Sequence, residues 1–193
     1  RLVGRGEPSG PQKLDAVAAR IAKIWRDTRD DEYVDESGQV SPARGALQIV
    51  FCDQSTPKAD RWNAYNTLKS LLVEQGLAPK AVRFIHSAKS DTDKARLFAA
   101  ARSGEVAVLL GSTEKMGVGT NVQARAVALH HLDCPWRPAD LAQRDGRIMR
   151  QGNQNPEVQI IRYVTGRSFD VYSWQTVERK AKFISQVMRG RLD

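Results

Sequence analysis

The sequence has little cysteine, no long apolar run and no phosphate-binding loop, and each absence excludes a class of protein. Its two cysteines, Cys52 and Cys134, have neither metal-ligand spacing nor the density of a secreted disulfide scaffold, so we expect buried thiols in a reducing cytoplasm. No stretch approaches the ~20 apolar residues that cross a bilayer, and no signal-peptide pattern opens the chain, which predicts a soluble protein with no membrane partner. A Walker A loop, G-x-x-x-x-G-K-[ST], and an acidic strand-end pair suited to magnesium are also absent. The chain therefore lacks the groups that cradle a nucleoside triphosphate.

Acidic residues are fewer than basic ones. The chain has 30 Lys and Arg against 22 Asp and Glu, which gives a formal net charge of +8 and a pI near 9.8. This balance favours a polyanionic partner, with nucleic acid first and a nucleotide second. Its 193 residues, 41% of them hydrophobic, can bury the core of one domain with an extension. The chain begins with Arg1 in a Gly- and Pro-containing stretch, as expected of a piece of a longer protein.

Short apolar runs alternate with helical patterns along most of the chain. We predict buried strands at 47–52, 82–85, 106–110, 126–133 and 158–164. Strands that alternate with helices indicate βαβ crossovers, which predict a three-layer α/β fold with a mostly parallel sheet of about five or more strands. We expect a linker at 1–12, a helix and exposed loop packing on the lobe at 13–46, and the lobe itself at 47–193.

Polar loops follow three of the predicted strands, at 53–58, 111–121 and 134–138. In parallel sheets the ligand sits beyond the carboxyl ends of the strands, so we expect these loops to line one rim. They supply small hydroxyl groups, lysines and a tryptophan, which suit a sugar-phosphate chain.

The most specific stretch is 143–153 (QRDGRIMRQGN), which places Arg144, Arg147 and Arg150 at intervals of three. We predict that the three arginines lie on one helix that faces a phosphate. Guanidinium groups fit phosphate oxygens well, and arginines this close repel one another unless they share an anion. A solvated basic helix face is the alternative reading of these residues alone.

Glycine and histidine patterns elsewhere indicate less. Gly117 and Gly119 follow a strand, as in a dinucleotide-binding G-x-G-x-x-G, but the third glycine is lacking. His130 and His131 are adjacent, so on a strand they point to opposite faces and cannot bind one metal ion, and His86 stands alone. We therefore predict structural histidines and no metal site.

Together these motifs resemble the C-terminal RecA-like lobe of superfamily 2 helicases, and more closely that of Swi/Snf-type translocases. Four segments carry the likeness, in family order: 48–56 resembles the first C-lobe motif, 109–121 motif V, 132–138 the segment before motif VI, and 143–150 motif VI. Gly146 departs from the Swi/Snf-type pattern and agrees with that of the wider superfamily. The chain from Arg162 to Ile184 further resembles large methylase–helicase proteins of bacteriophages and conjugative elements.

This resemblance implies one lobe of an ATP-dependent DNA helicase or translocase, inactive in isolation. ATP and Mg²⁺ would be bound mainly by an N-terminal lobe of the same parent chain, and a methylase domain is a further implied neighbour. DNA would be held through its backbone with little sequence specificity. The alternative, from another class, is a non-catalytic nucleic-acid-binding or scaffold module with a RecA-like fold.

The resemblance also assigns roles to residues. Arg147 and Arg150 would be arginine fingers, and Gln143 would help to position the nucleotide or couple it to the nucleic acid. The residues implied beside the nucleotide are Gly117, Gly119 and Asn121. Those implied to contact nucleic acid are Ser55, Thr56, Lys58, Ser112, Thr113, Lys115, Trp136 and Arg144.

Overall fold

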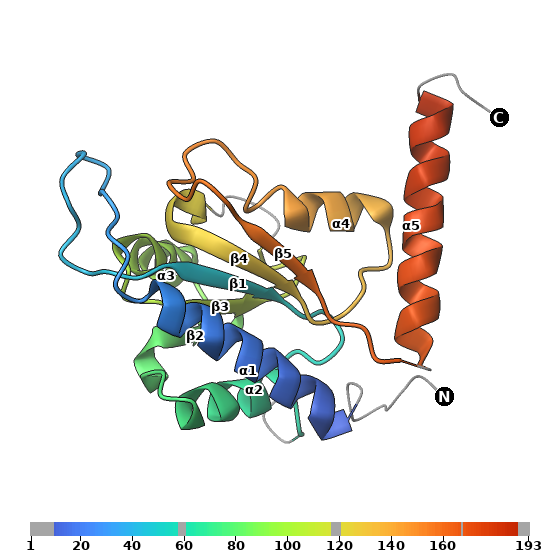
Figure 1. Ribbon diagram of the computed structural model, residues 1–193, viewed down its shortest axis with the longest axis horizontal. Helices are drawn as coiled ribbons and strands as arrows, with labels where there is room; N and C mark the ends of the chain where they lie inside the picture. Colours follow the sequence, from blue (N-terminus) through green and yellow to red (C-terminus); the bar gives the residue numbers. More distant parts are fainter. Residues whose placement is uncertain (1–9, 58–60, 117–120, 167, 189–193) are drawn as a thin grey trace.

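Five parallel strands form one sheet in the order β2-β3-β1-β4-β5 in the computed structural model, which describes residues 10–57, 61–116, 121–166 and 168–188 (Figure 1). The strands are β1 (Leu47–Phe51), β2 (Val82–Phe84), β3 (Val108–Gly111), β4 (Ala126–His131) and β5 (Gln159–Arg162). The predicted three-layer α/β fold with a parallel sheet is confirmed. The apolar run of β1 is buried at all five positions because helices cover both faces of this central strand.

Helices make up the two outer layers (Figure 1). On one face, α1 (Gly10–Thr28) and α2 (Ala64–Glu74) pack over Val50, and on the other, α3 (Asp91–Ser103) packs over Ile49. Beside them, α4 (Pro138–Asp145) packs on α5 (Phe169–Met188). Short 3₁₀ turns, η1 (Pro79–Ala81), η2 (Ile85–Ser87) and η3 (Gln123–Arg125), precede or follow strands. Among the described helices, none combines the length and apolar character that a bilayer crossing requires.

The start of one helix differs from the prediction. Helix α1 begins at Gly10, so the last residues of the predicted linker are helical, and Pro11 is tolerated because the first amides of a helix have no intrahelical partner. Helix α2 begins at Ala64, where the Asn63 side chain caps it by accepting a hydrogen bond from the Asn66 amide at 2.9 Å.

The three arginines of 143–153 do not share one helix, so that prediction was wrong. Helix α4 ends at Asp145, which leaves only Arg144 inside it. The amide of Arg147 then bonds to the Arg144 carbonyl at 3.0 Å, three residues back, which is a turn tighter than an α-helix. This turn brings Ile148 into the core beneath α3, where it is fully buried. The burial of Ile148 therefore accompanies the change in direction of the chain after Asp145.

A buried polar chain crosses the α1 face of the sheet. His130 lies between Tyr163, whose hydroxyl is 2.9 Å from Nδ1, and Gln48, whose Oε1 is 3.0 Å from Nε2. Because the Gln48 amide nitrogen donates to the Ile21 carbonyl at 2.9 Å, its oxygen must accept, so the His130 proton sits on Nε2 and Tyr163 donates to Nδ1. Every polar group of this chain is satisfied only when the imidazole is neutral. Burial lowers the pKa of His130 to about 3.

Protonation of His130 should make the fold acid-sensitive. Its folded pKa lies below its ordinary value near 6.5, so the unfolded chain binds more protons between these values and stability falls as the pH drops through this window. From about pH 7.5 to about pH 5 we expect His130 alone to cost about 2 kcal/mol of unfolding free energy. Urea titrations at both pH values measure the loss.

The matched comparison for this prediction is His130→Gln against Tyr163→Phe. The first variant removes the titrating group and should flatten the dependence of stability on pH, whereas the second keeps the imidazole and should retain most of it. An equal pH slope in His130→Gln and the unaltered chain would contradict the assignment.

Candidate functional site

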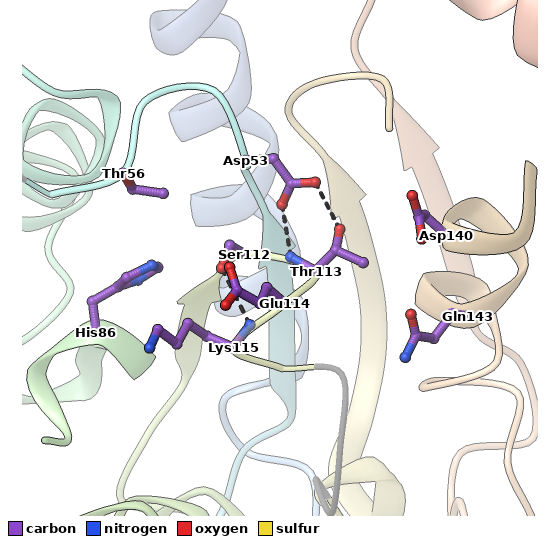
Figure 2. A pocket seen from close by; sticks show the side chains of 9 residues that line it. All are labelled: Asp53, Thr56, His86, Ser112, Thr113, Glu114, Lys115, Asp140 and Gln143. Carbon is purple, nitrogen blue, oxygen red and sulfur yellow. Dashed lines mark hydrogen bonds between the residues drawn. The ribbon is translucent and has the colours of Figure 1, made fainter. Parts of the chain in front are cut away.

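Loops from several strands and one helix enclose a pocket of about 630 Å³ at the carboxyl edge of the sheet (Figure 2). It is lined by Asp53, Thr56, His86, Ser112, Thr113, Glu114, Lys115, Asp140 and Gln143. In Figure 2, Thr56 and His86 lie on one side, the loop that follows β3 lies between, and Asp140 and Gln143 of α4 face it from the other side. Five of the lining residues, Thr56, Ser112, Thr113, Lys115 and Gln143, are sequence-predicted site residues that the fold brings together.

Close packing shapes the loop that follows β3. Gly111 ends this strand, and a Cβ atom there would collide with the side chains of Met116 and Ile85. Met116 is fully buried under the loop, and its amide bonds back to the Ser112 carbonyl at 3.0 Å. Glycine therefore allows the loop to fold down onto the core while Lys115 stays exposed at the pocket.

The hydroxyl groups at this edge differ in what they already bond. Thr113 donates its hydroxyl proton to Asp53 Oδ2 at 2.8 Å and accepts from Arg144 Nε at 2.7 Å. Among the described residues, Ser55 and Ser112 only accept hydrogen bonds, from the amides of Ala64 at 3.0 Å and Lys115 at 3.3 Å. A phosphate oxygen needs a donor, so the two serines suit this role better than Thr113.

Arg144 is entirely buried behind the pocket, with 0% of its side chain exposed. Each of its five N–H donors has a partner. The contacts are Nε to Thr113 Oγ1 at 2.7 Å, Nη1 to the Asp133 carbonyl at 2.9 Å and His131 Nδ1 at 3.3 Å, and Nη2 to Asp53 at 2.7 Å and Asp133 at 3.1 Å. No donor is left for a phosphate, so the expectation that Arg144 contacts nucleic acid does not fit its burial.

Two carboxylates share the Arg144 charge. Asp133 Oδ1 accepts from Arg144, while its Oδ2 accepts from the amides of Asp53 at 2.6 Å and Gln54 at 2.8 Å. Burial raises the pKa of Asp133, and the positive charge of Arg144 opposes this rise. Both oxygens act only as acceptors, which is the pattern of an ionised carboxylate.

The sequence interpretation missed these carboxylates, although a signal for them was present. Asp53 and Asp133 each follow a buried strand closely, and the two strands, β1 and β4, are neighbours in the sheet. Acidic side chains in that position on adjacent parallel strands meet at one edge. The sequence does not show that Arg144 is their partner, because the packing of α4 against the sheet brings it to them.

His86, which the sequence analysis predicts to be a structural histidine, also lines the pocket. It lies in η2, directly after β2, and its ring meets the Tyr65 ring edge-on with centroids 5.2 Å apart. Its Nδ1 is buried and has no hydrogen-bond partner among the described residues. Burial, and then the charge of Lys115, lower the pKa of His86, so its imidazole is neutral at neutral pH.

The other two arginines lie beyond the end of α4. Arg147 is 8% exposed, and Arg150 is exposed. Burial lowers the pKa of Arg147, and the charge of Arg150 lowers it further, which means that the two guanidinium groups are close enough to repel. An anion shared between them would relieve this repulsion.

Besides the three arginines, three predicted residues among those that the structure describes do not line the pocket. Asn121 is exposed, and its carbonyl accepts a hydrogen bond from Arg102 Nη1, near the end of α3, at 3.3 Å. Trp136 is 67% exposed in the loop before α4, and Ser55 is held by the start of α2. Lys58, Gly117 and Gly119 lie outside the described residues. A second cavity, of about 680 Å³, lies between the 34–43 loop and α3 and contains no predicted residue.

Most of the chain matches a known protein family. Residues 35–152 match the helicase conserved C-terminal domain, and this segment runs from the loop before β1 to just beyond Arg150. The chain belongs to this family. It is therefore a helicase C-terminal RecA-like lobe, and the match includes every residue that lines the pocket as well as Arg147 and Arg150.

One relative shares sequence over a short stretch. The helicase lobe is 40% identical over 77 residues to the Defense against restriction protein B of Escherichia phage P1. The match covers 40% of this chain and 3% of that protein, so the chain spans only a small fraction of the relative's length.

Solved structures of helicases have the same fold. The lobe superimposes on the C-terminal part of the Fun30 ATPase domain with a TM-score of 0.56 at 18% identity, over 86% of this chain and 44% of that one. With S. cerevisiae Dbp5 L327V bound to RNA and ADP BeF3 the TM-score is 0.59 at 18% identity, over 88% of this chain and 36% of that one. With the DUF1998 helicase MrfA bound to DNA the TM-score is 0.52 at 16% identity, over 72% of this chain and 18% of that one. At these identities the likeness establishes the fold alone.

Proposed function

We propose that this lobe is the C-terminal half of the motor of an ATP-dependent DNA translocase. It supplies Arg147 and Arg150 to a composite ATPase site whose phosphate loop and Mg²⁺ ligands are on an N-terminal RecA-like lobe. Gln143, at the pocket wall on α4, would position the nucleotide or couple it to DNA. The nucleotide-side contacts proposed for Gly117, Gly119 and Asn121 complete this half of the site.

The observation that carries the proposal is the contrast among the three arginines. Arg144 is neutralised inside the lobe by two carboxylates, whereas Arg147, which is 8% exposed, and the exposed Arg150 lie beyond the end of α4, close enough for the charge of Arg150 to lower the pKa of Arg147. A pair of adjacent guanidinium groups fits the terminal phosphate of a nucleotide held by another lobe. The residues present therefore fit one end of ATP, and the chain has no loop that could cradle the rest.

The pocket is proposed as the nucleic-acid side of the same lobe. Lys115 supplies an exposed positive charge, and Thr56 and Ser112 supply hydroxyl groups from two different loops. The contact with the DNA backbone would extend to Ser55, Lys58 and the exposed Trp136. Thr113 would hold the loop after β3 in place through its two hydrogen bonds to Asp53. Contacts of this kind bind DNA with little sequence specificity.

The proposal also covers the subfamily and the parent protein. Segment 132–138 favours a Swi/Snf-type motor. The likeness to a phage protein named for defence against restriction favours a large phage or mobile-element parent, with a methylase domain as a further neighbour. Both cysteines are buried and unpaired, in keeping with a cytoplasmic protein.

The direct test is ATP hydrolysis by a polypeptide that joins this chain to its N-terminal lobe. We expect hydrolysis that DNA stimulates in the joined protein and none in the 193-residue chain alone. A joined protein that binds DNA but hydrolyses no ATP would instead identify a non-catalytic binding module.

DNA binding by the isolated chain should be weak and strongly salt-dependent. Lys115→Ala is expected to weaken binding to every sequence and to reduce the slope of log affinity against log salt by about 1, because one phosphate contact is lost. Lys180→Ala, on an exposed turn of α5 away from the pocket, is the matched control and should leave the slope unchanged. Fluorescence anisotropy with labelled DNA at several salt concentrations measures both, and an equal slope for the two variants would remove Lys115 from the interface.

A further inference from the structure

A continuous set of charged contacts joins the pocket to the arginine segment. Asp53 lines the pocket. Its carboxylate accepts hydrogen bonds from the Thr113 amide at 2.7 Å, the Thr113 hydroxyl at 2.8 Å and Arg144 Nη2 at 2.7 Å. Arg144 lies in the last turn of α4, one residue before Asp145 and three before Arg147. The same helix presents Gln143 to the pocket. One short helix therefore touches the proposed DNA site at its wall and carries the proposed arginine fingers directly after its end.

We propose that Arg144 is a positioning residue that couples occupancy of the pocket to the placement of Arg147 and Arg150. This inference rests on the proposed function and adds the route by which DNA affects the ATPase site.

The geometry supplies a physical reason for the coupling. Asp53 is partly exposed, at 26%, so a phosphate that binds beside Lys115 places negative charge near an ionic contact that is incompletely shielded. The negative charge of Asp53 is then stabilised to a greater extent by Arg144, the positive group bonded to it. Because the Arg144 guanidinium is buried and all its donors are used, the change is transmitted to the backbone of α4 rather than absorbed by a side-chain rotation.

The end of α4 is also held by strands β4 and β5. His131 of β4 lies 3.3 Å from Arg144 Nη1 and donates through Nε2 to Asp145, the next residue of α4, at 2.7 Å. Arg162 of β5 stacks on Trp174 of α5 at 5.0 Å, and its Nη2 lies 3.9 Å from Asp145 Oδ2. Arg144 and Asp145 are therefore both tied to the sheet.

Two variants separate this role from a general loss of structure. Asp53→Asn is nearly isosteric and removes one negative charge from the pocket, and Thr113→Val removes only the hydroxyl between Asp53 and Arg144. Thr67→Val is the matched control, because the Thr67 hydroxyl also donates a single hydrogen bond, to the Asn63 carbonyl, but lies in α2 outside the pocket.

In the joined two-lobe protein, Asp53→Asn should bind DNA more tightly and yet show DNA stimulation of ATP hydrolysis reduced about tenfold. Tighter binding follows from lower repulsion of phosphate, and reduced stimulation from the weakened link to Arg144. Thr113→Val should lose stimulation similarly, and Thr67→Val should keep it. Stimulation equal to the unaltered protein in both pocket variants would overturn the coupling alone, whereas an unaltered protein that DNA does not stimulate would overturn the proposed function as well.

The isolated chain offers a second readout through its three methionines. Met149 is exposed beside Arg150, and Met188 is exposed at the far end of α5. With ¹³C-methyl-labelled methionine, a short DNA oligonucleotide should shift the Met149 signal in the unaltered chain and leave Met188 in place. Asp53→Asn should bind the oligonucleotide without this shift. A Met149 shift that persists in Asp53→Asn would mean direct contact with DNA and would overturn the relay through Arg144.

Discussion

Arg150→Ala in the joined two-lobe protein is expected to lower DNA-stimulated ATP hydrolysis by about 10³-fold while DNA affinity stays within twofold. The side chain is exposed, has no hydrogen bond or ion pair among the described residues, and lies outside the DNA pocket. Its removal therefore takes away charge at the departing phosphate without disturbing the fold or the pocket. Steady-state turnover at saturating ATP and DNA measures the effect.

The control for this prediction is Arg179→Ala, which removes another exposed arginine from α5, at a distance in sequence from the motif. It should hydrolyse ATP at the rate of the unaltered protein. Arg150→Lys should restore little, because a lysine ammonium lacks the forked pair of donors. Normal turnover in Arg150→Ala would exclude this residue as an arginine finger.

Arg144→Met is expected to cost about 3–5 kcal/mol of unfolding free energy in the isolated chain. The substitution retains much of the side-chain volume but leaves Asp133, whose side chain is 8% exposed, as a buried carboxylate without its cation. Asp53 and Thr113 lose a partner at the same time. Urea or guanidinium unfolding followed by circular dichroism measures the loss.

A double variant tests the cause of this destabilisation. Arg144→Met combined with Asp133→Asn removes the buried negative charge as well, so it should recover part of the lost stability relative to Arg144→Met alone. If the double variant is the less stable of the two, the cost does not come from an unpaired carboxylate. Arg179→Ala serves again as the reference and should change stability by less than about 0.5 kcal/mol.

The strands and helices were largely predictable because their signals are local. The run at 47–52 is apolar apart from Gln48, which is typical of a strand buried on both faces, and the structure places β1 at the centre of the sheet. Adjacent His130 and His131 had to point to opposite faces, and they do: one bonds to Gln48 under α1 and the other to Asp145 of α4. Alternation along a strand needs no knowledge of the partner elements.

The three arginines show what local patterns cannot resolve. Their spacing is compatible with one helix, but the chain turns after Asp145, where Ile148 enters the core. The complete enclosure of Arg144 depended on two aspartates, Asp53 and Asp133, that lie 91 and 11 residues from it. A motif identifies residue types that suit phosphate, whereas only the packing shows which of them are already neutralised.

The sequence by itself determined the α/β class, the parallel sheet, the loops at one rim and the absence of a phosphate loop, because each follows from patterns within a few residues. Only the tertiary structure decided the division of labour within 143–153. Arg144 is enclosed and paired, since desolvating a guanidinium is tolerated only where carboxylates from distant loops meet it. Arg147, which is 8% exposed, and the exposed Arg150 lie beyond the end of α4, and their mutual repulsion suits them to an anion from outside the lobe.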